Sequence, residues 1–151
     1  MDRFKVGILT FSDGRKYIHE DLLETNWRYQ DRLTRALEAT GEVQVVAGTE
    51  IVWTPRVAQA QARRLAAAAV DLTIFNYAIW AFPHLTGIAS RFAPGPFLLF
   101  SNLHPSEPGM VAMLSAAGMM DQFGETHSRL WGDAEDEQVM RRMLAFVRAA
   151  G

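Results

Sequence analysis

The chain has no cysteine among its 151 residues, which excludes disulfide bonds, thiolate metal sites and a cysteine nucleophile. It also lacks an excess of positive charge, because 17 Asp and Glu residues outnumber 15 Lys and Arg residues, for a formal net charge of −2. Binding through nucleic-acid phosphates requires a basic surface, so nucleic acid is not an expected partner. No apolar run approaches the roughly 20 residues of a membrane-spanning helix, and the N-terminal residues show no signal peptide. We therefore expect a cytoplasmic protein with no membrane partner.

What remains is an ordinary globular composition of 49% hydrophobic and 21% charged residues. The chain is long enough for one domain with a core and too short for two. It contains no internal repeat, no low-complexity stretch and no linker. We therefore predict that residues 1–151 form a single domain, which is either a complete protein or one domain of a longer one.

Short apolar runs alternate with helical segments along the whole chain, which is the pattern of an α/β protein. The runs predict strands over residues 6–11, 43–47, 71–77, 96–101 and 127–131. The segments predict helices over residues 17–40, 54–70, 85–91, 109–117 and from residue 133 to the C-terminal end.

Local signals mark the ends of three of these helices. Gly41 stands in the usual place for a helix C-terminus. Thr54 and Pro55 supply an N-cap and a first-turn proline. Asp133, followed three residues later by Asp136, resembles a capping box that opens the last helix.

Alternating strands and helices require a parallel sheet covered by helices on both faces. With right-handed crossovers, the favoured arrangement is the flavodoxin-like one, a three-layer αβα sandwich with strand order 2-1-3-4-5. In such sheets, ligands bind beyond the carboxyl ends of the strands, near the point where the strand order reverses. Here that point lies between the first and third strands.

The residues that follow the strands suit a ligand with many hydroxyl groups. Asp13 and Arg15 follow the first strand, Trp80 follows the third, and Asn102 and His104 follow the fourth. Arginine and asparagine side chains bind hydroxyl groups, and an indole ring covers the apolar side of a sugar. We therefore predict these five residues as substrate-binding residues.

Structural explanations of the same residues remain open. Asp13 belongs to an ordinary Asp-Gly turn pair, Arg15 is explained equally well as a solvated charge, and Trp80 as a side chain packed under a loop. The four histidines show no metal-ligand spacing. No G-x-G-x-x-G follows the first strand, so a dinucleotide site would lack its phosphate-binding loop.

Several short segments together resemble the N-terminal domain of the L-fucose isomerase and L-arabinose isomerase superfamily. In chain order they are Ser12-Asp13-Gly14-Arg15-Lys16, His19-Glu20, Asn76-Tyr77-Ala78-Ile79-Trp80, Asn102-Leu103-His104-Pro105-Ser106-Glu107-Pro108-Gly109 and Arg129-Leu130-Trp131-Gly132-Asp133. The resemblance extends over essentially the whole chain.

The resemblance implies the first domain of a longer, metal-dependent enzyme of carbohydrate metabolism that interconverts aldoses and ketoses. In these enzymes later domains bind the divalent metal, usually manganese, through two carboxylates and a histidine. The first domain reaches the active site of a neighbouring subunit, and the family motif carries over to Arg15 and Trp80. We therefore expect no cofactor in this chain, a manganese ion in the full-length enzyme, and other subunits of a homo-oligomer as partners.

The positions of the acidic residues agree with catalysis by later domains rather than by this one. Isomerisation requires a base near the transferred proton and an electrophile for the two oxygens. At the strand ends, only Asp13 falls near a histidine, His19. We therefore predict that this chain alone is inactive and serves substrate recognition and assembly. The alternatives are a stand-alone sugar-binding module and an oligomerisation domain. Trp27 lies off the apolar stripe of its helix, so it marks either a subunit contact or the flank of the core.

Overall fold

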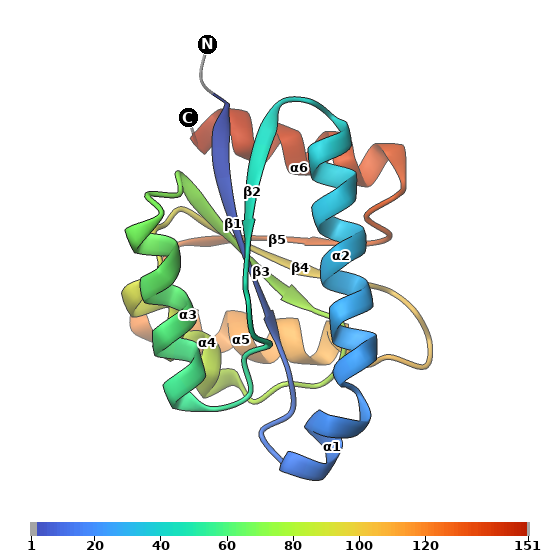
Figure 1. The fold of residues 1–151 in the computed structure, drawn as a ribbon, viewed down its shortest axis with the longest axis vertical. Coiled ribbons are helices and arrows are strands. Elements are labelled where there is room, and N and C mark those ends of the chain that lie inside the picture. Colours follow the sequence, from blue (N-terminus) through green and yellow to red (C-terminus); the bar gives the residue numbers. More distant parts are fainter. Residues whose placement is uncertain (1–2, 151) are drawn as a thin grey trace.

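The predicted strands pair into one parallel sheet with the order β2-β1-β3-β4-β5, as Figure 1 shows for the computed structural model. The strands are β1 (Phe4–Phe11), β2 (Val43–Ala47), β3 (Leu72–Tyr77), β4 (Phe97–Ser101) and β5 (His127–Trp131). The helices are α1 (Lys16–Asp21), α2 (Leu23–Ala39), α3 (Pro55–Ala67), α4 (Pro83–Phe92), α5 (Gly109–Phe123) and α6 (Glu137–Ala150). The structure describes residues 3–150, so the two ends of the predicted domain, residues 1–2 and 151, lie outside it. The fold class and the strand order predicted from the sequence are confirmed.

Two apolar cores sandwich the sheet, one on each face. Strands β3 and β4 are buried along their full length, which explains why they read as continuous apolar runs. Successive strand residues point to opposite faces, so Leu72 and Ile74 pack toward α2 and α6, whereas Phe75 and Tyr77 pack toward α3, α4 and α5. The three-layer αβα sandwich follows from this double burial.

Two of the predicted helix ends are confirmed in detail. The Oγ1 atom of Thr54 accepts a hydrogen bond from the Val57 amide at 3.2 Å, and Pro55 is the first residue of α3. Gly41 adopts a φ of +74°, the left-handed conformation that favours glycine after a helix.

The helix predicted over residues 17–40 is divided in the structure. Leu22 separates α1 from α2 with a φ of −104° and a ψ of 8°. Helix α1 lies beyond the end of the sheet, where β1 ends, whereas α2 runs along one face of the sheet (Figure 1). The apolar pattern continues across the break, so periodicity alone does not show that the direction of the chain changes.

The predicted capping box is wrong by one turn. Asp136, not Asp133, precedes α6, and its Oδ1 atom accepts hydrogen bonds from the amides of Gln138 at 2.8 Å and Val139 at 3.3 Å. The carboxylate of Asp133 instead stabilises the preceding turn by accepting a hydrogen bond from the Glu135 amide. Asp133 is thereby left at the carboxyl end of β5, where it pairs with a side chain of α2.

Candidate functional site

Four loops meet at the carboxyl edge of the sheet and carry the polar residues that the sequence singled out. They connect β1 to α1, β3 to α4, β4 to α5 and β5 to α6. The structure divides the five predicted site residues into two groups. Asp13, Arg15 and Trp80 lie on the first two loops, and Asn102 and His104 lie on the third.

Arg15 is held in place by Asp13. The Asp13 carboxylate, whose side chain is only 2% exposed, accepts hydrogen bonds from Arg15 Nε at 3.0 Å, from Nη2 at 2.7 Å and from the Arg15 amide at 2.9 Å. The hydrogen bond from the Arg15 side chain outweighs burial and keeps the pKa of Asp13 below its usual value. The Arg15 side chain is 52% exposed. Asp13 therefore orients a guanidinium group that still faces solvent.

The loop that carries Trp80 lies against the loop that carries Arg15. A Cβ atom on Gly14 would lie 3.1 Å from the Phe82 ring, so these two residues are in close contact. Trp80 meets the Phe82 ring edge-on, with the ring centroids 6.0 Å apart, and is partly buried against the core. The structure thus brings the segments of Arg15 and Trp80 together through Phe82, and it gives Trp80 the packing contacts that the structural alternative describes.

Asn102 has a structural role that its place after a strand did not indicate. Its Nδ2 atom donates a hydrogen bond to the Ala78 carbonyl at 2.8 Å, and its Oδ1 atom accepts one from the His104 amide at 2.7 Å. These bonds join the end of β3 to the loop after β4. The His104 side chain is largely exposed, and its Nδ1 atom lies 2.8 Å from Oε2 of Glu107.

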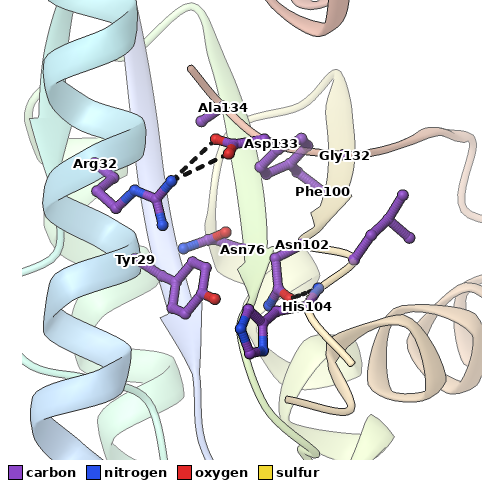
Figure 2. A pocket seen from close by; sticks show the side chains of 10 residues that line it. Tyr29, Arg32, Asn76, Phe100, Asn102, His104, Gly132, Asp133 and Ala134 are labelled. Atoms are coloured by element: carbon purple, nitrogen blue, oxygen red, sulfur yellow. Dashed lines mark hydrogen bonds and ion pairs between the residues drawn. The ribbon is translucent and has the colours of Figure 1, made fainter. Parts of the chain in front are cut away.

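Asn102 and His104 line a cavity of about 210 Å³ between α2 and the ends of β3, β4 and β5. Figure 2 shows this cavity, which we call the α2 pocket, with Tyr29 and Arg32 on the helix side and Asn76 between the helix and the loops. The full lining comprises Tyr29, Arg32, Asn76, Phe100, Asn102, Leu103, His104, Gly132, Asp133 and Ala134.

Hydrogen bonds and ion pairs connect α2 to the loops on both sides of the α2 pocket. The hydroxyl group of Tyr29 donates to Glu107 Oε2 at 3.2 Å, and burial together with this carboxylate raises the pKa of Tyr29. On the other side, Arg32 binds Asp133 through Nη2 at 3.1 Å and Glu135 through Nε at 3.0 Å. Burial alone would lower the pKa of Arg32, but the two carboxylates raise it.

The sequence analysis did not select four of the residues that line the α2 pocket: Tyr29, Arg32, Asn76 and Asp133. The phenol of Tyr29 lies at the pocket, and its hydroxyl group is hydrogen-bonded to Glu107. One feature of the sequence could have indicated this pocket. Asn76 is a polar residue that follows Leu72 and Ile74 on the same buried face of β3. A buried amide at such a position is the kind of departure from apolar patterning that marks a site.

A buried histidine supports the loop that carries Arg15. His19, only 7% exposed, stacks on Trp53 with the ring centroids 4.6 Å apart, and its Nδ1 atom lies 2.9 Å from Oγ of Ser12. Burial lowers the pKa of His19, although Glu20 and Glu50 act in the opposite direction. Burial in the folded chain therefore favours the neutral form of this imidazole.

This histidine predicts a pH dependence of stability. Because the pKa of His19 is lowered in the folded state, the unfolded chain takes up the proton first as the pH falls below its reference pKa of about 6.5. The free energy of unfolding should then fall with decreasing pH, by less than about 1.4 kcal/mol per pH unit, the limit for one proton. Urea unfolding at several pH values checks this: His19→Gln should flatten the slope, and His84→Gln, at an exposed histidine, is the matched control. Equal slopes in all three chains would contradict the assignment.

Within residues 3–150, no three histidine, aspartate or glutamate side chains gather closely enough to hold a metal ion. Asp13 and His19, the one acidic and histidine pair noted in the sequence, are engaged with Arg15 and with Ser12 and Trp53. The described part of the chain also contains no helix that is both long and apolar enough to cross a membrane.

The sheet order and the polar clusters beyond its carboxyl edge define a flavodoxin-like α/β domain. The comparison with protein families is more specific. The model for the family described as L-fucose isomerase, first N-terminal domain, matches residues 3–151, so the chain belongs to this family. This match confirms the resemblance drawn from the sequence motifs. None of the curated proteins compared with the chain matches it.

Proposed function

We propose that this chain is the substrate-recognition and assembly domain of a cytoplasmic aldose–ketose isomerase that acts on L-fucose, L-arabinose or a similar sugar. The domain presents Arg15 and Trp80 to the active site of a neighbouring subunit. Other parts of the enzyme supply the metal, the acid and the base, and this chain supplies binding and orientation of the sugar.

One observation carries the proposal: Asp13 holds the Arg15 guanidinium in a fixed orientation while more than half of the Arg15 side chain stays exposed. A charge that served only solubility would not need a buried partner. An oriented donor that still faces solvent is suited to bind hydroxyl groups of a ligand that a second subunit holds.

The surface around Arg15 also fits contact with a neighbour. Helix α1 projects beyond the carboxyl end of β1 (Figure 1), and it carries Tyr17, whose relative exposure is 68%. Aromatic side chains are enriched at protein interfaces. Trp27, the residue for which the sequence left a subunit contact open, is partly buried, so Tyr17 is the better candidate for a contact between subunits.

The divalent metal expected for such an isomerase does not fit the described residues, because they offer no cluster of ligands. We therefore derive no catalytic step through a metal in this domain. In the proposed enzyme, the metal-binding carboxylates and histidine belong to later domains.

The test is kinetic and uses the complete isomerase that contains this domain. Arg15→Ala and Trp80→Ala, made separately, should each lower kcat/KM. For Arg15→Ala we expect about a ten- to hundredfold loss, the range for a hydrogen bond to a charged group. Metal affinity should stay unchanged, because neither residue is a ligand.

Arg148→Ala is the matched control, because Arg148 forms an equally close ion pair with Glu42 at 2.8 Å, away from the carboxyl edge of the sheet. It should retain the kcat/KM of the unaltered enzyme. If Arg15→Ala and Trp80→Ala also retain it with several aldoses, the domain does not touch the sugar. The role of the domain would then be limited to assembly.

A further inference from the structure

The α2 pocket is built within one chain and does not include Arg15 or Trp80. Its volume of about 210 Å³ is below the roughly 300–1,000 Å³ of pockets for drug-sized ligands. An occupant must therefore be about the size of a single sugar ring. The pocket raises the question of a ligand that is bound independently of any neighbouring subunit.

Asn76 is the strongest indication of a ligand. It is only 3% exposed, and its Nδ2 atom donates a hydrogen bond to Thr10 Oγ1 at 3.0 Å. Within residues 3–150 its Oδ1 atom has no hydrogen-bond partner. In Figure 2 this oxygen lies on the side of the amide turned away from α2. Although the Asn76 side chain is buried, this oxygen is not fully enclosed. A hydroxyl donor from water or a ligand in the pocket can therefore reach it.

The charges of the α2 pocket decide which ligand chemistry fits. Arg32 is the only Lys or Arg among the lining residues, and Asp133 and Glu135 already neutralise it. Glu107 adds a further carboxylate beside Tyr29. An anionic ligand would therefore meet more negative than positive charge. A metal ion would find no group of three histidine, aspartate or glutamate side chains among the described residues.

Hydrogen-bonding groups remain available for a neutral ligand. The Nη1 group of Arg32 has no carboxylate partner among the described residues, and Figure 2 shows it turned toward the side of Tyr29 and Asn76. Apolar surface lies beside these polar groups, contributed by Phe100 and Leu103. Donors, acceptors and apolar surface at close range match the alternating hydroxyl and C–H groups of a polyol.

We propose that the α2 pocket binds a neutral, polyhydroxylated small molecule of monosaccharide size, with Asn76 Oδ1 accepting from one hydroxyl group and Arg32 donating to another. The site belongs to the single domain and is separate from the contact proposed for Arg15 and Trp80. It therefore stands or falls independently of the proposed isomerase function.

The test is a titration of the ¹⁵N-labelled 151-residue chain, followed by NMR, with L-fucose, its alditol and inorganic phosphate as probes. L-fucose or the alditol should shift the side-chain amide signals of Asn76 and the backbone signals of residues 132–134 in a saturable way, with a Kd below about 10 mM. Phosphate should leave these signals unchanged.

Two variants and a control locate the binding. Arg32→Gln should raise the Kd at least about tenfold and Asn76→Ala about fivefold, as expected for a charged and a neutral hydrogen bond. Arg148→Gln removes a comparable ion pair outside the pocket and should leave the Kd unchanged. The Arg32 side chain is 34% exposed, whereas Asn76 is almost fully buried, so the Arg32 variant keeps the test valid if Asn76→Ala fails to fold.

Three outcomes would overturn the proposal. The first is that neither L-fucose nor the alditol shifts the signals of the pocket residues. The second is that phosphate alone shifts them, which would indicate an anion site. The third is that Arg32→Gln binds both polyols as tightly as the Arg148→Gln control.

Discussion

Replacing Gly109 by alanine should lower the free energy of unfolding by about 2 kcal/mol or more, the range for overpacking a close-packed site. Gly109 is the first residue of α5, and it lies against the end of β3. A Cβ atom there would overlap the Tyr77 carbonyl oxygen and would lie 3.0 Å from Ser101 Oγ and 3.1 Å from Asn102 Nδ2. Backbone cannot move aside as a flexible side chain can, so α5 and the loop before it must shift.

A second glycine of α5 supplies the control for this prediction. Gly118 lies in the interior of the helix, and a Cβ atom there would meet nothing within 4 Å. Gly118→Ala should therefore stabilise the chain by about 0.5–1 kcal/mol, the difference in helix propensity. Urea unfolding of both variants measures the contrast. If Gly109→Ala were as stable as Gly118→Ala, the close approach of α5 to β3 would be wrong.

Replacing Asp13 by asparagine should lower the kcat/KM of the complete isomerase about tenfold, because a small misplacement of a binding group is costly to catalysis. Asparagine preserves the size of the side chain but removes the charge that holds the Arg15 guanidinium through Nε and Nη2. We therefore treat Asp13 as a positioning residue. Its effect should depend on Arg15, so Asp13→Asn should add almost nothing to Arg15→Ala in a double-mutant cycle.

Asp71→Asn is the matched control for this cycle. Asp71 also accepts a backbone hydrogen bond, from the Lys5 amide at 2.8 Å, but at the opposite, amino edge of the sheet. It should leave kcat/KM unchanged and combine additively with Arg15→Ala. If Asp13→Asn also combined additively, Asp13 would affect the enzyme by a route other than Arg15.

The fold was predictable because both faces of the sheet are buried. Strands with two buried faces require uninterrupted apolar runs, and such runs are visible between turn residues. The predicted boundaries of the strands over residues 43–47 and 127–131 agree with β2 and β5. The ends of the helices were harder to predict. α5 continues to Phe123 rather than residue 117, because the chain leaves the helix only at Gly124, with a φ of +71°.

The site was predictable only where position along a strand determines it. The rule that ligands lie beyond the carboxyl ends selected Asn102 and His104, and the structure places both at the α2 pocket. The side-chain amide of Asn102, however, forms its hydrogen bonds with the backbone. Arg32 was out of reach, because its partners Asp133 and Glu135 are about 100 positions away in the sequence. Contacts between a helix face and distant loops depend on how the helix is rotated, and periodicity does not fix that rotation finely enough.

The central claim is that this domain completes the active site of another subunit, and a mixing experiment tests it most directly. One form of the proposed complete isomerase carries Arg15→Ala, and the other is inactivated at the metal-binding carboxylates that we propose for its later domains. Equal amounts of the two are dissociated together and reassembled, and native mass spectrometry confirms that mixed oligomers form. If Arg15 acts on a neighbouring subunit, some sites in the mixed oligomers combine an intact Arg15 with an intact metal centre. The kcat/KM of the mixture should then lie clearly above the average of the two parent enzymes. A value equal to that average, with mixed oligomers present, would contradict it.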